Sequence, residues 1–210
     1  DFRKPLGKPF EAPFQPTIAK YTDNYIIMMS GSKMFSYAGQ RIAIIAISDV
    51  LYHREYPLLP VWYKMSRLGD AFVFAVLYAV SSGATHSAQY ALAEMFRAAA
   101  DGELDFVTSA AEYARRAKIS KKMFIDNGFH IVYSMDGDEP VSDGFFYTVG
   151  YKGMSSGELM AEMIRYGMAT IALSTTGSRQ PGVRICVSQL NRPEQFDMLE
   201  ERLRLFAADH

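Results

Sequence analysis

Hydrophobic and polar positions divide the first half of the chain into short apolar runs followed by longer segments with a helical period. The runs 25–29 and 41–47 are rich in β-branched residues and continuously apolar. Continuous rather than alternating apolarity is typical of strands that are buried on both faces. Four helices are then predicted, over 61–69, 71–80, 87–100 and about 104–127. The run 71–80 is about half the length that a bilayer span needs, so it predicts a buried helix.

After Gly128 the pattern changes to short strand-like runs separated by turns and two further helices. The predicted strands cover 130–135, 144–151, 168–174 and 183–190, and the predicted helices cover 156–166 and 193–207. Strands and helices in this order indicate a small α+β domain. We therefore expect a first domain over 1–115 and a small domain over 116–210, joined by the long helix at about 104–127.

Composition and charge are those of an ordinary globular protein. Of the 210 residues 49% are apolar and 21% charged, which is ordinary for a globular protein. A net charge of −1 gives no reason to expect binding to nucleic acid or to a membrane surface. The single cysteine, Cys186, cannot form an internal disulfide, so a cytoplasmic location is the default. A free cysteine of this kind is expected to be a small buried hydrophobe.

Two kinds of catalytic site find little support in the residue spacing. The four histidines have no metal-ligand spacing with one another or with Cys186, so no metal site is predicted. The segment GMSSG (153–157) matches the nucleophile elbow of serine hydrolases. However, Ser155 is followed three residues later by Glu158, which is the pattern of a capping box at the start of a helix. We therefore interpret this serine as a helix cap.

The segment SGSKMFSYAGQRIA (30–43) carries the strongest chemical signal. The hydroxyl residues Ser30 and Ser32 precede Lys33, and Arg41 follows eight positions after the lysine. This order resembles, position by position, the lysine motif of the class I/II aminotransferases, which use pyridoxal 5′-phosphate. A second segment, GVRICVSQL (182–190), is similar to the C-terminal strand of that family, and Arg184 occupies the position of its carboxylate-binding arginine. The resemblance covers essentially the whole chain.

The resemblance implies a role for each of these residues. Lys33 would carry the cofactor as a Schiff base and move a proton during the reaction, and burial near other cations favours the neutral form of such an amine. Arg41, Ser30 and Ser32 would bind the cofactor phosphate. Arg184 would bind the substrate α-carboxylate with its planar fork of donors. The implied reaction moves an amino group from an α-amino acid to a 2-oxo acid.

The resemblance also implies an architecture. The fold class would be α/β: the C-terminal part of a fold-type I large domain, with a mixed or parallel sheet and helices, followed by a small α+β domain. The family places its ring-nitrogen aspartate and its ring-stacking aromatic upstream of the lysine motif. We therefore expect the chain to be a C-terminal portion that is inactive or nearly so by itself. A homodimer is expected, with the loop 81–89 packed near the cofactor phosphate or serving as a plain helix N-terminus.

Other interpretations stay open at this point. Another fold-type I enzyme, such as a decarboxylase or a carbon–sulfur lyase, would share Lys33 and Arg41 while breaking a different bond. A non-catalytic binding domain could also keep the fold. At the level of single residues, Lys33 could be a solvated surface lysine. Arg41 and Arg184 could be partners in structural ion pairs.

Overall fold

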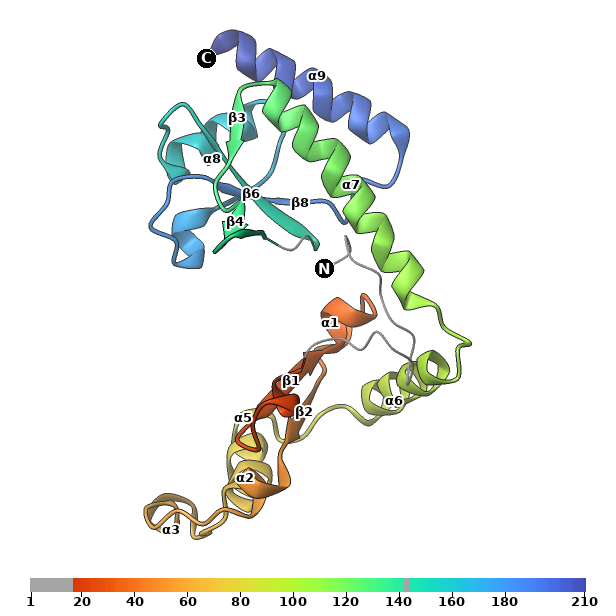
Figure 1. The fold of residues 1–210 in the computed structure, drawn as a ribbon, viewed down its shortest axis with the longest axis vertical. Coiled ribbons are helices and arrows are strands. Elements are labelled where there is room, and N and C mark those ends of the chain that lie inside the picture. Colours follow the sequence, from red (N-terminus) through yellow and green to blue (C-terminus); the bar gives the residue numbers. More distant parts are fainter. Residues whose placement is uncertain (1–16, 142–143) are drawn as a thin grey trace. The chain divides into compact units, whose positions relative to one another are not determined.

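The computed structural model describes residues 17–141 and 144–210, drawn in colour in Figure 1. The described residues fall into two compact units, 17–106 and 107–210, and each is described by itself. The division falls at the first turn of the long helix α7 (Phe106–Asp126). The expected boundary at 115/116 lies inside this helix. The assignment of one unit to cofactor binding and of the other to a small domain stays a prediction.

The first unit is built on an antiparallel hairpin. Strand β1 (Ile26–Ser30) pairs with β2 (Ala43–Ile47), so that Ser30 lies opposite Ala43. The loop between them contains one turn of helix, α1 (Gly31–Met34), and the 3₁₀ turn η2 (Ala38–Gln40). All the sheets formed by the described residues are antiparallel, so the expected mixed or parallel sheet is wrong for this part of the chain. A parallel pair needs a long crossover connection, whereas this loop returns the chain directly beside β1.

The expected burial of both hairpin faces is also wrong. In β1, exposed and half-buried side chains alternate at first, and Met28 is 76% exposed. Apolarity on both faces shows that either face could be buried, but burial needs a packing partner on each side. Helix α6 (His86–Ala100) forms a cluster in which Leu92 packs with Ile42 of the preceding loop and with Ile44 near the start of β2.

Helices fill the rest of the first unit. Their bounds are η1 (Ile18–Lys20), α2 (Asp49–His53), α3 (Leu59–Tyr63), α4 (Leu68–Asp70), the π-helical segment η3 (Ala71–Leu77) and α5 (Tyr78–Ser81). The helix predicted over 61–69 is broken after Tyr63, because Lys64 adopts a left-handed conformation that ends α3. The segment 71–80 is helical as predicted. Its expected burial is wrong, since Phe74 and Val80 are exposed.

The second unit is a four-stranded antiparallel sheet with three helices. The strands lie in the order β3-β6-β8-β7. Their bounds are β3 (Phe129–Ile131), β6 (Phe146–Tyr151), β7 (Ile171–Ala172) and β8 (Val183–Cys186), and a separate pair is formed by β4 (Met135–Asp136) and β5 (Glu139–Pro140). The helices are α7, α8 (Ser156–Arg165) and α9 (Pro193–Asp209), with a 3₁₀ turn η4 (Leu173–Thr176) after β7. Helices and antiparallel sheets thus give the chain an α/β composition.

The core of the second unit lies between one face of its sheet and the three helices (Figure 1). Val149 and Val183 from the sheet are fully buried against Leu159 of α8 and Leu203 of α9. Because side chains alternate along a strand, the residues of β8 that do not face this core point to the opposite face of the sheet. Cys186 is therefore exposed, and the expectation that it is a buried hydrophobe is wrong.

Candidate active site

The loop between β1 and β2 holds four of the five site residues predicted from the sequence. Ser30 ends β1 and caps α1, because its Oγ accepts a hydrogen bond from the backbone N–H of Ser32 at 3.3 Å. The next residue, Gly31, donates its N–H to the carbonyl oxygen of Ile42 at 3.1 Å. These two contacts turn the chain out of the strand and join the two ends of the loop.

Gly31 is where the loop folds back on itself. Its carbonyl oxygen accepts from the backbone N–H groups of Phe35 (3.2 Å) and Tyr37 (3.1 Å). A Cβ atom on this buried residue would lie 3.4 Å from the carbonyl oxygen of Ile42 and 3.4 Å from Cδ1 of Leu92. These distances are ordinary van der Waals contacts, so Gly31 packs against both the end of the loop and α6. Below the loop, the rings of Phe35 and Phe96 pack edge to face with their centroids 5.2 Å apart.

Lys33 lies on the single turn of α1, between the capping serine and the closing aromatic residues. Lys33 is exposed and Ser32 is half-buried. The lysine is therefore more open to solvent than an amine whose pKa is lowered by burial would be. Because its backbone is held by the cap at Ser30 and by the loop closure at Gly31, its position on the loop is nevertheless well constrained.

Arg41 follows η2 and precedes β2, which begins two residues later than the sequence predicts. Its backbone is left-handed, with φ 51° and ψ 49°. A residue other than glycine in this region costs roughly 1–2 kcal/mol. The arginine Nη1 donates to the carbonyl oxygen of Ala38 at 2.9 Å, so the exposed side chain turns back over its own loop. The guanidinium is thereby kept on the same short segment as Lys33.

Arg184 belongs to the second unit and is described apart from the loop. It lies on β8, inside the run predicted as a strand, and opposite Thr148 of β6. Its guanidinium carbon is 4.2 Å from the centroid of the Phe146 ring, a cation–π contact that orients the planar fork. The sequence reasoning missed Phe146. The alternation along β6 could have found it, since the ring lies on the face opposite the buried Tyr147 and Val149.

The other sequence candidates have structural roles. At the start of α8, Ser155 Oγ accepts from the backbone N–H of Glu158 at 3.3 Å, and the carboxylate accepts from the backbone N–H of Ser155 at 2.9 Å. The predicted capping box is confirmed, and hydrogen bonding of the Ser155 side chain and then of its backbone N–H to the carboxylate lowers the pKa of Glu158. In the loop 81–89, Thr85 occupies the N-cap position of α6 without a capping bond from its side chain. A role for this loop near a phosphate stays a prediction.

Two further features concern the described residues as a whole. In the ranges 17–141 and 144–210, no group of three histidine, cysteine or acidic side chains could hold a metal ion. Within the same ranges, no helix has both the length and the apolarity to cross a membrane.

One closed loop carries a lysine amine, a guanidinium and two serine hydroxyls. A site with these groups can take a small aldehyde that bears a phosphate. Comparison with protein families agrees with this chemistry. The model of the family "Aminotransferase class I and II" matches residues 6–203, and the chain belongs to this family. Most members are enzymes that depend on pyridoxal phosphate. A search among curated proteins gave no match.

The donor set of the loop fits this cofactor. An amine can condense with the cofactor aldehyde, and a guanidinium with neighbouring hydroxyls suits a phosphate. Lys33, Arg41 and the two serines supply these groups from 12 consecutive positions, 30–41. The group that pairs with the pyridine nitrogen is not assigned to any described residue.

Proposed function

We propose that the protein is a pyridoxal-phosphate-dependent aminotransferase that moves an amino group from an α-amino acid to a 2-oxo acid. The observation that carries the proposal is the placement of Lys33, Arg41, Ser30 and Ser32 on one loop that is closed by the Gly31–Ile42 hydrogen bond. The family to which the chain belongs supports the same cofactor. A fold-type I arrangement, with the first unit contributing to the cofactor domain, is part of this proposal.

The phosphate would be held by the end of the loop that carries Arg41. Its guanidinium has five N–H donors, of which one is used by the carbonyl oxygen of Ala38. The remaining donors can bind phosphate oxygens in a bidentate manner, and the hydroxyls of Ser30 and Ser32 can add further hydrogen bonds. A phosphate bound there would fix the position of the cofactor relative to Lys33.

Lys33 would provide the reactive amine. When bound, the cofactor supplies an aldehyde and an electron-withdrawing ring that stabilises negative charge at the substrate Cα. The neutral Nζ of Lys33 can accept the proton from the substrate Cα and later donate a proton, as a general base and then a general acid. The exposure of Lys33 in the described structure indicates that the bound cofactor, rather than the loop alone, would exclude water from the amine.

Arg184 would bind the α-carboxylate of the amino acid. Stacking on Phe146 covers a face of the guanidinium but leaves the N–H donors at its edge available. Two parallel N–H···O bonds to a carboxylate fix the orientation of the substrate as well as adding affinity. Correct alignment of the Cα–H bond is worth several kcal/mol of barrier in reactions of this kind, on the order of 7–11 kcal/mol at its upper limit.

A homodimer is also part of the proposal. The first unit exposes large apolar side chains, among them Met28, Trp62 and Phe74. Exposed apolar surface of this extent favours association. The cytoplasmic location predicted from the single cysteine stays a prediction.

The cofactor assignment is tested by trapping the cofactor on the intact protein. The protein is incubated with pyridoxal phosphate, reduced with borohydride, digested and analysed by mass spectrometry. We expect the pyridoxyl label on Lys33 and its loss in Lys33→Ala, with Lys64→Ala, an exposed lysine of the same unit, as the matched control. Label on another lysine would refute the assignment.

The reaction type needs a second measurement on the same protein. Amino acids are supplied together with 2-oxoglutarate, and the products are identified. Glutamate and a new 2-oxo acid would support transamination. Release of carbon dioxide or of a thiol without glutamate would show a decarboxylase or a carbon–sulfur lyase instead. Cofactor binding with no turnover of any amino acid is also expected if this chain supplies only part of the catalytic groups, so that result would leave a binding role open.

A further inference from the structure

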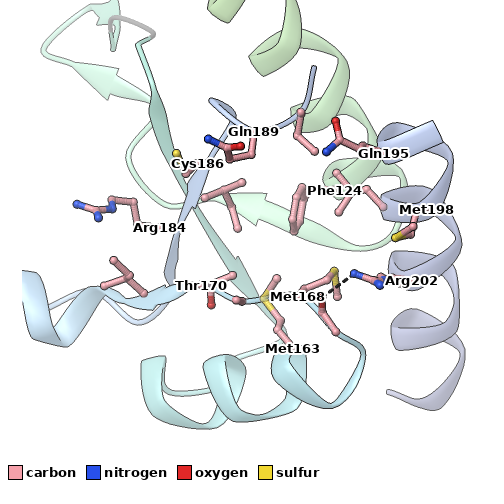
Figure 2. A pocket seen from close by; sticks show the side chains of 16 residues that line it. Phe124, Met163, Met168, Thr170, Arg184, Cys186, Gln189, Gln195, Met198 and Arg202 are labelled. Carbon is pink, nitrogen blue, oxygen red and sulfur yellow. Dashed lines mark hydrogen bonds between the residues drawn. The ribbon is translucent and has the colours of Figure 1, made fainter. Parts of the chain in front are cut away.

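A cavity of about 490 Å³ lies within the second unit, at the edge of the sheet next to α9 (Figure 2). It is bounded by the turn that follows α8, by strand β8 and by the first half of α9. The described side chains that line it are mainly apolar, including Phe124, Met163, Met168, Leu190, Met198 and Leu199. A volume of this size is within the range of small-molecule sites, roughly 300–1,000 Å³.

The cavity exists because β7 is short. The ladder between β7 and β8 contains only the pairs Ile171–Arg184 and Ala172–Val183. Thr170 precedes the ladder, so the chain from the end of α8 diverges from Ile185 and Cys186 instead of pairing with them. Helix α9 borders the resulting space. The sheet edge therefore opens into the cavity, which the core residues Phe124 and Met163 also line.

A buried hydroxyl marks the wall of this cavity. Thr170 lines it, and its Oγ1 is inaccessible to solvent without a hydrogen-bond partner among the described residues. A buried polar atom left without a partner costs about 1–3 kcal/mol, and most such atoms in native proteins are satisfied. A rotation of the Thr170 side chain that brings the hydroxyl to the cavity would let a ligand accept its hydrogen bond and remove this cost.

The charges around the cavity favour an anion. Arg202 extends from α9 toward the turn after α8, where its Nη1 donates to the carbonyl oxygen of Gly167 at 2.6 Å (Figure 2). The rest of its guanidinium has donors to offer to a ligand. None of the described lining residues is acidic. Arg184 also borders the cavity, but its guanidinium points away from the other lining side chains and stacks on Phe146.

We propose that this cavity binds a small monocarboxylic acid with an apolar body, whose carboxylate contacts Arg202 and whose apolar part lies among the methionine and leucine side chains. The Thr170 hydroxyl donates a hydrogen bond to the bound acid. Binding at this site uses none of the groups that hold the cofactor, although Arg184, to which the proposed function gives the substrate carboxylate, borders the cavity. A ligand here would tie α9 to the turn between α8 and β7.

The test uses the intact protein labelled with ¹³C at the methionine methyl groups and 4-phenylbutyrate as the probe. We expect millimolar 4-phenylbutyrate to shift the NMR signals of Met163, Met168 and Met198, with smaller effects elsewhere. The neutral analogue 4-phenylbutan-1-ol, which keeps the apolar body, is expected to bind more weakly. Absence of shifts at these three methyl groups, or equal affinity for the alcohol, would overturn the proposal.

Two variants separate the polar contacts from the shape of the cavity. Arg202→Gln should weaken 4-phenylbutyrate binding roughly tenfold, since a charge-assisted contact is lost, and leave the affinity for the alcohol unchanged. Arg204→Gln, an exposed arginine on the same helix that does not line the cavity, is the matched control. Thr170→Val keeps the shape of the side chain and should weaken the acid about threefold to tenfold. Unchanged affinity in both cavity variants would refute the assigned contacts, and it would do so whatever the outcome of the cofactor trapping at Lys33.

Discussion

Replacing Gly182 with alanine should break the strand that carries Arg184. Gly182 immediately precedes β8 and is buried. Its N–H donates to Ser156 Oγ at 3.0 Å, and its carbonyl oxygen accepts from the backbone N–H of Leu173 at 2.9 Å. These bonds connect β8 to α8 and to the end of β7. A side chain at this position would therefore disturb three elements at once.

The magnitude follows from two independent effects. The φ angle of Gly182 is +142°, a region that side chains other than glycine rarely adopt, and forcing alanine into it costs about 1–3 kcal/mol. The added Cβ would also lie 2.6 Å from the carbonyl oxygen of Val149 and 2.9 Å from Cγ2 of Val132. Relieving such overpacking costs a further 1–3 kcal/mol, approximately. We expect a loss of roughly 2–6 kcal/mol in the free energy of unfolding of this unit.

Hydrogen exchange followed by mass spectrometry measures this loss peptide by peptide, so the strands of the two units are followed separately. Peptides from β6 and β8 should exchange faster in Gly182→Ala, while peptides from β1 and β2 should be unaffected. Gly157→Ala is the control, since no atom lies within 4 Å of a Cβ added there. Because Gly157 is in a helix, that change should be neutral or stabilise by up to ~1 kcal/mol. The expected destabilisation is refuted if the free energy of protection from exchange in Gly182→Ala lies within ~0.5 kcal/mol of that of the original protein, which is the usual range for surface substitutions.

Three further predictions concern the site, the second unit and assembly. Arg184→Lys keeps the charge but loses the planar fork of donors, so KM for the amino acid should rise strongly while cofactor retention changes little. Loss of cofactor at unchanged KM would mean that the roles of Arg184 and Arg41 are exchanged. Ser155→Ala should destabilise the second unit by about 1 kcal/mol in urea titrations at neutral pH. The pKa of Glu158 is lower in the folded than in the unfolded protein, so its contribution to stability is present above the unfolded-state pKa and is lost as the pH falls through the folded-state pKa. Ser155→Ala should therefore lose less stability on acidification than the original protein, and equal acid sensitivity would contradict this. In sedimentation over a dilution series the chain should self-associate, because Met28 and Phe74 are exposed, and a strict monomer at high concentration would argue against it.

The four long helices could be predicted from the sequence because their signals are local. The bounds of α6, α7, α8 and α9 agree with the predicted ranges to within two residues. Periodic apolar positions and caps such as the Ser155–Glu158 pair act over one or two turns, so they need no information from distant parts of the chain. The order of chemical groups in the loop 30–43 was equally readable, since a motif with fixed spacing is a property of the chain itself.

Burial and pairing depended on residues far apart in the sequence. The continuous apolar runs around β1 and β2 indicated strands correctly, but they did not reveal that Met28 would be exposed. An apolar side chain can be buried, but whether it is buried depends on which elements pack beside it. Cys186 is exposed for a similar reason: its side follows from the alternation of β8, in which Val183 and Ile185 face the core.

By itself, then, the sequence determined the class of chemistry and the local elements: a lysine and an arginine in a motif, and helices with readable ends. Only the tertiary structure decided how the loop closes through Gly31, what Arg184 stacks on, and how far β7 extends. The run 168–174 predicted a full strand, yet only two of its residues pair with β8, and the space left at that sheet edge became the cavity beside α9. The length of a strand is set by the partner that it finds, and the sequence of the strand alone does not contain that partner.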